Sequence, residues 1–458
     1  MTKQLAKQSR SNIQKHQPKS FKPKNQSRKI KVNHDFLGDH SRKGNPQNPR
    51  GQEQMRCPYN QKCGACQLVE VPYEQQLKQK QTAMNRLFKS YVKPASIVGM
   101  ENPYYYRNKV HAVFKKERYG TIKAGTYKEG THEVIQIENC LIEDQKASCI
   151  IQTIYTLVKS FKYTIFDEDT LQGFFRHALI RVGKHTGEIL VVLVTGQLQF
   201  PSKKHFIQAL LKAHPEITSI VQSINPVHTN MILGKREIRL YGKGYIEDIL
   251  CGCRFKISAQ SFYQINPIQT EKLYEKAIEL AGLTGKEKVI DAYCGIGTIG
   301  IIASQKSRKV WGVEVNKTAI RDAIINASLN ERSNISFTEA DATKWLVDMA
   351  EAGKKADVVF MDPPRAGSTK RFIEAVTQLA PQRVVYISCN PETLKRDLDD
   401  FTSKNYSVKQ IIPFDLFPHT SHIETCVLLS NERNQHYNIS VKVDVGEEYQ
   451  ETNKNLEV

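Results

Sequence analysis

The chain has no apolar run of about 18 residues, which a membrane-spanning helix would need. Its first ten residues also lack the apolar core of a secretory signal. We therefore expect a cytoplasmic protein without membrane association. Ten cysteines in 458 residues without an export signal fit a reducing compartment, where clustered cysteines more often bind metal or react than form disulfides.

Acidic residues are scarce near the N-terminus. Residues 1–50 hold 13 lysines and arginines but only Asp35 and Asp39 as acids, a net charge of +11, while the whole chain carries +19. Because large apolar residues are also few, we predict a disordered basic arm over residues 1–52. This charge favours a polyanionic partner, with nucleic acid as the default, although a solvated face with a solubility tail would look similar.

Two hydrophobic patterns follow the arm. Residues 53–262 contain a helical segment at 73–90 and then short alternating runs, which predict a central α+β domain with antiparallel strands. Residues 263–432 alternate strands with helices, which predicts βαβ units and a parallel sheet. Residues 433–458 form a polar tail that we expect to be peripheral.

A glycine-rich loop follows the predicted strand at 288–292. Gly295, Gly297 and Gly300 form a G-x-G-x-x-G motif between a strand and a helix, the context of nucleotide-cofactor loops. Glu314 ends the next predicted strand, where an acid can accept hydrogen bonds from ribose hydroxyls. The motif predicts a cofactor site, and a turn needed only for packing is the weaker interpretation.

Two further acids bear on the choice of cofactor. Asp291 precedes the glycine loop, where it would repel a pyrophosphate but tolerate a cationic sulfonium. Asp341 ends a predicted strand at 335–340, where it would meet an adenine amino group. The pattern therefore favours S-adenosylmethionine over a dinucleotide.

Three reactive side chains are predicted at the same edge of the parallel sheet. Cys389 ends the predicted strand at 384–388, and Asp362 follows the strand at 357–361. Ligands bind at the carboxyl ends of such strands, and a thiol there is a candidate nucleophile, although a lone cysteine is more often a small buried hydrophobe. Glu424 begins the final strand, which would bring it to the same cleft if it ran antiparallel at the sheet edge.

A thiol and a carboxylate beside a methyl donor suggest one reaction. The thiolate of Cys389 would add to C6 of a uracil ring, C5 would take the methyl group, and a base would remove the C5 proton. Without the thiol adduct, C5 is a poor nucleophile, which explains the need for a cysteine. DNA cytosine methyltransferases place their nucleophile in a Pro-Cys pair, which is missing at Cys389.

Five segments together resemble the bacterial RNA 5-methyluridine (uracil-C5) methyltransferase family. They are Ser-Phe-Tyr-Gln-Ile-Asn (261–266), Asp-Ala-Tyr-Cys-Gly-Ile-Gly (291–297), Asp-Pro-Pro-Arg (362–365), Ser-Cys-Asn-Pro (388–391) and His-Ile-Glu (422–424). The resemblance implies a C-terminal Rossmann-like class I methyltransferase domain with a mostly parallel sheet and an antiparallel edge strand. It also implies Cys389 as nucleophile and Glu424 as the base. The implied cofactor contacts are Gln264, Tyr293, Glu314, Asp362, Asp341 and Thr298.

A cysteine cluster precedes the central domain. Cys57, Cys63 and Cys66 have the spacing C-x5-C-x2-C, and Cys140 is placed to supply a fourth thiolate. From spacing alone, an iron–sulfur cluster, a zinc site and free thiols all remain open. The cluster resembles that of the iron–sulfur-containing 23S rRNA members of the same family, which implies a [4Fe–4S] cluster on these four cysteines.

The same resemblance bears on the RNA target. The cysteine cluster favours 23S rRNA as the substrate, while transfer RNA remains open, and no obligate protein partner is implied. The tyrosines at 104–106 would stack bases or lie on a half-buried strand face. A non-catalytic RNA-binding assembly factor is the alternative from another functional class.

Overall fold

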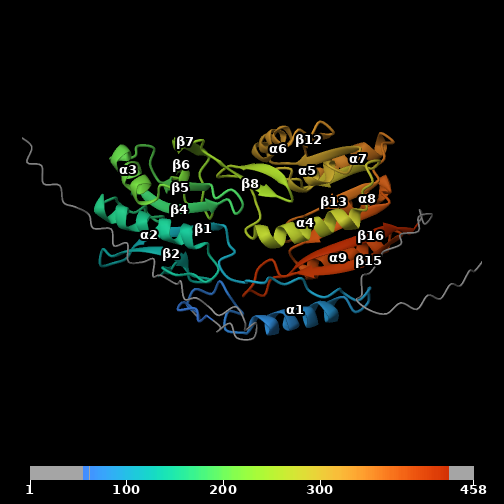
Figure 1. Ribbon diagram of the computed structural model, residues 1–458, viewed down its shortest axis with the longest axis horizontal. Coiled ribbons are helices and arrows are strands. Elements are labelled where there is room, and N and C mark those ends of the chain that lie inside the picture. The colour runs from blue at the N-terminus through green and yellow to red at the C-terminus, as the bar shows by residue number, and fades with distance from the viewer. Residues whose placement is uncertain (1–54, 61, 433–458) are drawn as a thin grey trace, which may run out of the picture. The chain divides into compact units, whose positions relative to one another are not determined.

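The computed structural model describes residues 55–60 and 62–432. The described residues belong to one compact unit with two seven-stranded sheets and a two-stranded hairpin (Figure 1). The predicted arm at 1–52 and the tail at 433–458 lie outside the described residues. The predicted boundary between residues 262 and 263 stays a prediction.

The first sheet has the strand order β3-β2-β1-β4-β5-β6-β7. All its neighbouring strands are antiparallel except the pair β5 and β6, so this region is the predicted mixture of helices and mainly antiparallel strands. Helices α2 and α3 share a hydrophobic core with it. The elements are β1 (Lys109–Lys116), β2 (Ile122–Tyr127), β3 (Val134–Gln136), α2 (Gln145–Ser160), β4 (Phe175–Val182), β5 (Ile189–Thr195), α3 (Lys203–Ala213), β6 (Ile217–Ile224) and β7 (Arg236–Gly242).

The second sheet has the order β12-β11-β10-β13-β14-β16-β15, and its first five strands are parallel. This is the predicted Rossmann-like sheet. Its elements are α4 (Pro267–Ala281), β10 (Lys288–Ala292), α5 (Thr298–Ser304), β11 (Lys309–Glu314), α6 (Lys317–Leu329), β12 (Ile335–Glu339), α7 (Ala342–Glu351), β13 (Val358–Met361), α8 (Lys370–Leu379), β14 (Arg383–Ser388), α9 (Pro391–Thr402), β15 (Tyr406–Phe414) and β16 (Glu424–Asn431).

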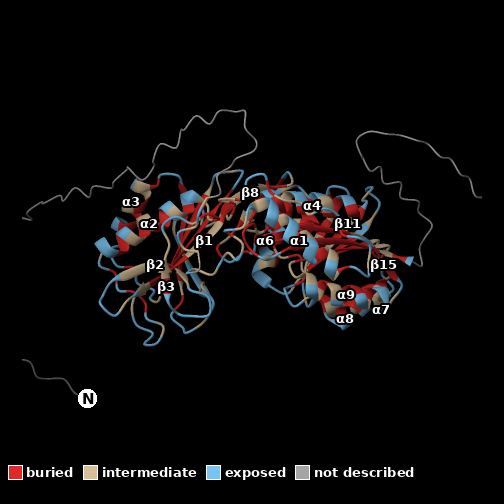
Figure 2. Ribbon diagram, turned by 90° about the horizontal axis from the view of Figure 1, so that it is seen from below, coloured by how far each residue is buried: buried red, intermediate tan, exposed pale blue. Residues whose placement is uncertain are grey.

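Helices cover both faces of this sheet, which explains why its strands are continuously apolar. Val385 and Ile387 of β14 share one core with residues of α4, α5 and α6. Val384 and Tyr386 point the other way, into a core with residues of α7, α8 and α9. Figure 2 shows the strands as the buried centre of this layered arrangement.

The antiparallel strand predicted at the sheet edge lies inside the sheet instead. β16 is antiparallel to β14, as predicted, but it also pairs with β15, which forms the edge. Proline removes a backbone donor and so disfavours the interior of a sheet. In the structure Pro413 belongs to β15, where it pairs with Thr425, and an edge strand tolerates that loss.

Helix α1 (Tyr73–Leu87) precedes the first sheet in the chain but packs beside the second. Its Met84, together with Phe88, shares a core with Leu394 and Leu398 of α9. Figure 1 shows α1 beside α9 and β15. The hairpin β8 (Ile246–Leu250) and β9 (Cys253–Ile257) leads from the first sheet to α4.

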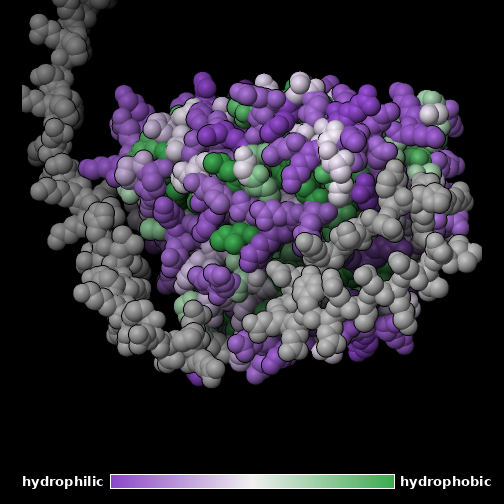
Figure 3. All heavy atoms as spheres, turned by 45° about the vertical axis from the view of Figure 1, so that its right-hand side comes forward, coloured by the Kyte–Doolittle hydropathy of each residue, from purple (hydrophilic) through white to green (hydrophobic). Residues whose placement is uncertain are grey.

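The described surface is mainly hydrophilic on the face shown in Figure 3, where hydrophobic residues form small, separate patches. Within residues 55–60 and 62–432, none of the helices combines the length and the hydropathy of a membrane span.

Candidate active site

The structure brings Cys389, Asp362 and Glu424 to one edge of the second sheet. Ser388 of β14 pairs with Thr425 of β16, so the neighbouring Cys389 and Glu424 lie opposite one another where the two strands meet the cleft. Asp362 directly follows β13, the strand beside β14. The predicted convergence of these three side chains is therefore present.

Burial dominates the electrostatics of these groups. It raises the pKa of the Cys389 thiol to about 11, with smaller contributions from the charges of Glu424 and Asp362. The pKa of Glu424, which is 2% exposed, is raised well above its usual range by burial and by Asp362. Burial raises the pKa of Asp362 to about 7. The Arg365 guanidinium opposes the shift at Cys389 and Glu424, so it is the cation that favours their charged forms.

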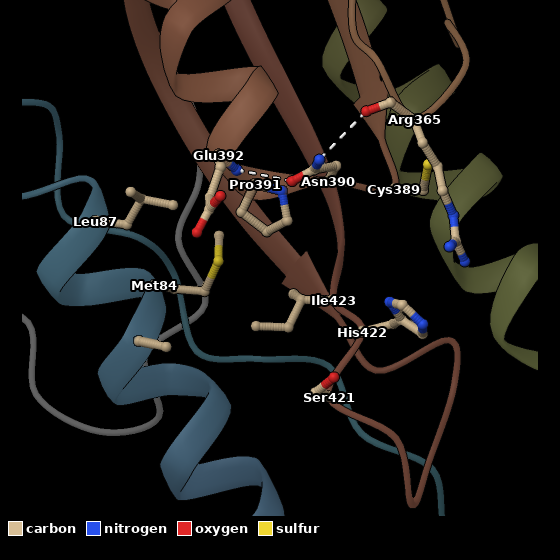
Figure 4. Close-up of a pocket in the computed structure, with 11 residues that line it drawn as sticks. Met84, Leu87, Arg365, Cys389, Asn390, Pro391, Glu392, Ser421, His422 and Ile423 are labelled. Atoms are coloured by element: carbon tan, nitrogen blue, oxygen red, sulfur yellow. Dashed lines mark hydrogen bonds between the residues drawn. The ribbon is translucent and has the colours of Figure 1, made fainter. Parts of the chain in front are cut away.

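Asn390 fixes the loop that carries the cysteine. Its Oδ1 accepts a hydrogen bond from the Glu392 backbone N–H at 3.1 Å and so caps α9. Its Nδ2 donates to the Arg365 carbonyl at 3.2 Å, and Figure 4 shows both bonds. The residue is thus both an ordinary helix cap and a link between the Cys389 loop and the Asp-Pro-Pro-Arg loop.

A cavity of about 340 Å³ opens beside Cys389. Arg365 and His422 line it near the cysteine, while Met84 and Leu87 line it from α1 (Figure 4). The sequence predicted a helix at 73–90 with Met84 and Leu87 on one side. It carried no signal that this side faces the sheet edge with Cys389, because the contact joins residues some 300 positions apart in the chain.

The glycine loop is held by two acids. Asp291 Oδ2 accepts a hydrogen bond from the Gly300 N–H at 2.7 Å, and Glu314 Oε2 accepts one from the Gly295 N–H at 3.2 Å. A Cβ at Gly300 would lie 2.8 Å from Asp291 Oδ2, whereas a Cβ at Gly295 would meet nothing within 4 Å. The space beside Gly295 is therefore open for a ligand, and Gly300 is needed for packing against Asp291.

Asp291 is not the charged carboxylate that the sequence analysis expects beside the cofactor. It is 1% exposed, and burial raises its pKa to about 8. At neutral pH the carboxyl is mostly protonated, so repulsion of a pyrophosphate is weak and is not what discriminates between cofactors. Its observed contact is the hydrogen bond to the glycine loop.

The other predicted cofactor residues surround this loop. Tyr293 has a left-handed backbone (φ 65°), and its hydroxyl lies 3.4 Å from Ser368 Oγ. Thr298 begins α5, and its side chain bonds the hydroxyl of Tyr274, whose pKa is raised by burial and by Asp362.

Asp341 and Gln264 lie in connecting segments. Asp341 does not end a strand, since β12 stops at Glu339; it caps α7 by accepting from the Lys344 N–H at 2.9 Å. Burial is the main cause of the raised pKa of Tyr293, and the charge of Asp341 raises this pKa further, so the two residues are neighbours. Gln264 is half-buried between β9 and α4. The binding roles of all these residues remain predictions.

The four clustered cysteines gather in one region without forming a recognisable metal site. Burial and the neighbouring Cys63 and Cys57 raise the pKa of Cys66 to about 12, and burial with Glu143 raises that of Cys140 to about 12, with a smaller effect from Cys66. Across the part of the chain that the structure describes, no group of three or more His, Cys, Asp or Glu residues is arranged to hold a metal ion. The predicted iron–sulfur site is thus not confirmed.

The tyrosines at 104–106 lie in a loop, not on a strand. The Tyr104 ring stacks on His419, with centroids 4.8 Å apart, and buried Tyr106 donates its hydroxyl to the Pro418 carbonyl at 3.0 Å. Two of the three residues therefore support the turn that precedes β16. Stacking of RNA bases on them stays a prediction.

Known proteins with similar sequences decide the family. The sequence profile of the family described as tRNA (uracil-5-)-methyltransferase matches residues 235–432. An uncharacterized RNA methyltransferase of Bacillus cereus is 39% identical over 406 residues, which cover 88% of each chain. One of Staphylococcus aureus is 41% identical over 379 residues, 82% of this chain and 83% of its own. The chain belongs to the RNA uracil-C5 methyltransferase family.

Membership in this family confirms the identification made from the five sequence motifs: the protein is an S-adenosylmethionine-dependent RNA methyltransferase. The structure is similar to that of Pyrococcus abyssi tRNA (uracil-54, C5)-methyltransferase in complex with S-adenosyl-L-homocysteine, with a TM-score of 0.68 and 26% identity. The similarity covers 80% of this chain and 86% of the archaeal one. The predicted iron–sulfur 23S rRNA subtype is not confirmed by these relatives.

Proposed function

We propose that this methyltransferase modifies C5 of a uridine in RNA through a covalent bond between Cys389 Sγ and uracil C6. The observation that carries the proposal is the register of β14 against β16, which sets Cys389 opposite Glu424. The same sheet edge holds the glycine loop, and the cavity beside Cys389 gives a uracil ring access to the thiol. A nucleophile, a base and a cofactor loop therefore meet at one place.

S-adenosylmethionine fits the loop at the end of β10, where Gly295 leaves open space and acids surround it. When bound, it would supply an activated methyl group and a positive charge. The proposed contacts are Gln264, Tyr293, Glu314, Asp362, Asp341 and Thr298. Glu314 suits ribose hydroxyls because its carboxylate is fixed by the N–H groups of Gly295 and Asn316, the latter at 2.8 Å.

The reaction begins with loss of the Cys389 proton and addition of Sγ to C6, which moves the ring electrons toward C5. C5 would then take the methyl group while the bond between that group and the sulfonium sulfur of the donor breaks, and S-adenosylhomocysteine would leave. Glu424 removes the remaining C5 proton, the C5–C6 double bond re-forms, and the C6–S bond breaks to regenerate the thiolate. Asp362 orients the uracil ring during these steps.

The protonation of Cys389 and Glu424 depends on the positive charges near them, including that of a bound cofactor. With a pKa of about 11, Cys389 is a neutral thiol in the free protein at pH 7. Burial also favours the protonated form of Glu424. Arg365 already lowers the pKa of both groups, and a second positive charge at the cofactor site would act in the same direction.

The RNA target that we propose is 23S rRNA, supported by the resemblance of the cysteine cluster to ribosomal members of the family. Transfer RNA is the second candidate, favoured by the similarity to an archaeal enzyme whose name gives tRNA uracil-54 as its target. Mapping 5-methyluridine in both RNAs from cells with and without the gene distinguishes them. Loss of one modified position in rRNA supports the first proposal, and loss in tRNA alone replaces it by the second.

We also propose that Cys57, Cys63, Cys66 and Cys140 hold a [4Fe–4S] cluster. The support is the family resemblance and the proximity of the thiols, since Cys63 and Cys57 raise the pKa of Cys66 and Cys66 raises that of Cys140. Iron, sulfide and zinc should be measured in protein purified without oxygen. About four irons per chain that disappear in Cys140→Ala are expected; zinc in their place, or no metal, would rule the cluster out.

Transfer of label from tritiated S-adenosylmethionine to RNA tests the catalytic proposal directly. RNA from cells lacking the gene should be labelled by the wild-type enzyme and not by Cys389→Ala. Cys149→Ala is the matched control, since it makes the same chemical change at an exposed cysteine of α2. Labelling by Cys389→Ala at the control rate would exclude the adduct, and no labelling by any form would favour the non-catalytic RNA-binding alternative.

A further inference from the structure

We infer that the cavity beside Cys389 binds two adjacent nucleotides of the RNA: the target uridine at the cysteine, and the base of a neighbouring nucleotide against helix α1. This inference rests on the proposed function and extends it by assigning a second base site. The loops after β13 and β14, the start of α9, the turn before β16 and helix α1 build it, and α1 lies outside the methyltransferase sheet.

The cavity has two chemically different ends. Cys389, Arg365 and His422 make one end polar. Leu87 and Ala83 of α1 make the other end apolar, beside the buried Met84 and Ile423, the latter directly before β16. Figure 4 shows Met84 and Leu87 extending from α1 toward Glu392 and Pro391, with Cys389 and Arg365 on the far side.

The polar end suits the target base because only there can C6 reach the sulfur. A uridine that reaches Cys389 must leave its stack, so the next base along the chain loses a partner. Proteins that bind unstacked RNA receive such bases on flat apolar or aromatic surfaces. The half-buried Leu87 and the exposed Ala83 offer apolar area for this purpose, beside Met84, which is only 1% exposed.

The charges of Arg365 and Glu392 determine where the RNA backbone would cross the cavity. Arg365 takes part in none of the ion pairs among the residues that the structure describes, so its guanidinium is available for a phosphate. Glu392 lines the cavity near Met84, where its carboxylate would repel a phosphate (Figure 4). The phosphate between the two nucleotides therefore belongs on the Arg365 side, which directs the neighbouring base toward α1.

The α1 wall is fixed to the same turn that carries His422. Lys80 Nζ forms a buried ion pair with Asp415 Oδ1 at 2.7 Å. The Gln76 side chain contacts His419 twice, with Nε2 at 3.1 Å from the imidazole Nδ1 and Oε1 accepting the backbone N–H at 2.9 Å. These contacts fix the separation between α1 and the loop that carries Cys389. A site that stacks a nucleobase at one position requires such a fixed separation.

Ala83→Trp tests the inference because it fills the apolar end from an exposed helix position that lines the cavity. Thr82→Trp is the matched control: Thr82 is the adjacent exposed residue of α1 and does not line the cavity. The probes are uridine monophosphate and the dinucleotides UpA and ApU. Their binding to the full-length protein, with S-adenosylhomocysteine present, is measured by calorimetry.

Wild type and Thr82→Trp should bind one of the dinucleotides about tenfold more tightly than uridine monophosphate, which corresponds to about 1.4 kcal/mol. Ala83→Trp should remove that advantage, and Leu87→Ala should reduce it. Equal binding of mononucleotide and dinucleotides by wild type, or an advantage that survives in Ala83→Trp, would overturn the inference. Because these measurements need no methyl transfer, a failure of the catalytic proposal leaves their outcome readable.

Discussion

Replacing Lys80 by methionine should lower the free energy of unfolding by about 3–5 kcal/mol. The ammonium group is 3% exposed and lies 2.7 Å from Asp415, which is fully buried. It also donates to the Phe417 carbonyl at 3.4 Å. Its loss would leave the Asp415 carboxylate uncompensated in the interior, and that uncompensated charge accounts for most of the expected cost.

The effect can be measured by urea unfolding, followed by the fluorescence of the two tryptophans, Trp311 and Trp345. Lys78→Met changes an exposed lysine on the same helix and should stay within about 0.5 kcal/mol of wild type. The double variant Lys80→Met/Asp415→Leu should recover most of the loss, because two apolar side chains can replace a buried ion pair. Hydrogen exchange of α1 amides would reveal detachment of this helix alone.

An unchanged unfolding midpoint and unchanged α1 exchange in Lys80→Met would refute the reasoning. So would a double variant as unstable as the single one, since the cost would then not come from the unpaired carboxylate.

Three further predictions concern the catalytic edge. Glu424→Gln should reduce methylation by about 10²–10⁴-fold, because the C5 proton stays in place. A methylated RNA–protein adduct should then accumulate and be visible on a denaturing gel. Rapid turnover without an adduct would contradict the role of Glu424. The methylation rate should rise from pH 7 to pH 9, since the reactive forms of Cys389 and Glu424 are deprotonated and the pKa values of both groups are raised. Arg365→Gln should shift this pH profile to higher pH, because it removes the cation that lowers both pKa values. A flat profile would count against a thiolate nucleophile. Gly300→Ala should weaken S-adenosylmethionine binding measured by calorimetry by about 1–3 kcal/mol, because the new Cβ would lie 2.8 Å from Asp291 Oδ2 and displace the loop; unaltered affinity would show that the loop adapts.

Local patterns in the sequence were sufficient for the parallel sheet and for the convergence of Cys389 with Asp362. The β-branched runs mark the strands, and residues that directly follow parallel strands meet at one edge whatever the details of packing. The antiparallel direction of β16 was implied by the family resemblance, because the residues alone gave it only as the condition for bringing Glu424 to that edge.

Features that depend on distant contacts could not be predicted in this way. The place of β16 between β14 and β15 depends on strand pairing, which joins residues distant in the sequence. The position of α1 against the catalytic edge depends on contacts such as Lys80 with Asp415, which join opposite ends of the chain. The raised pKa of Asp291 depends on burial, which no local pattern reveals.

The pairing of Ser388 with Thr425 has a consequence for how this enzyme can change during evolution. Because successive side chains of a strand point to opposite faces, a one-residue insertion or deletion inside β16 would turn the Glu424 carboxylate away from the cysteine. The turn at 415–423 lies outside the paired residues, but the contacts of Asp415 with Lys80 and of His419 with Gln76 hold it against α1. We therefore expect length variation in this turn to be rare, and the count of residues along β14 and β16 to be preserved as strictly as Cys389 itself.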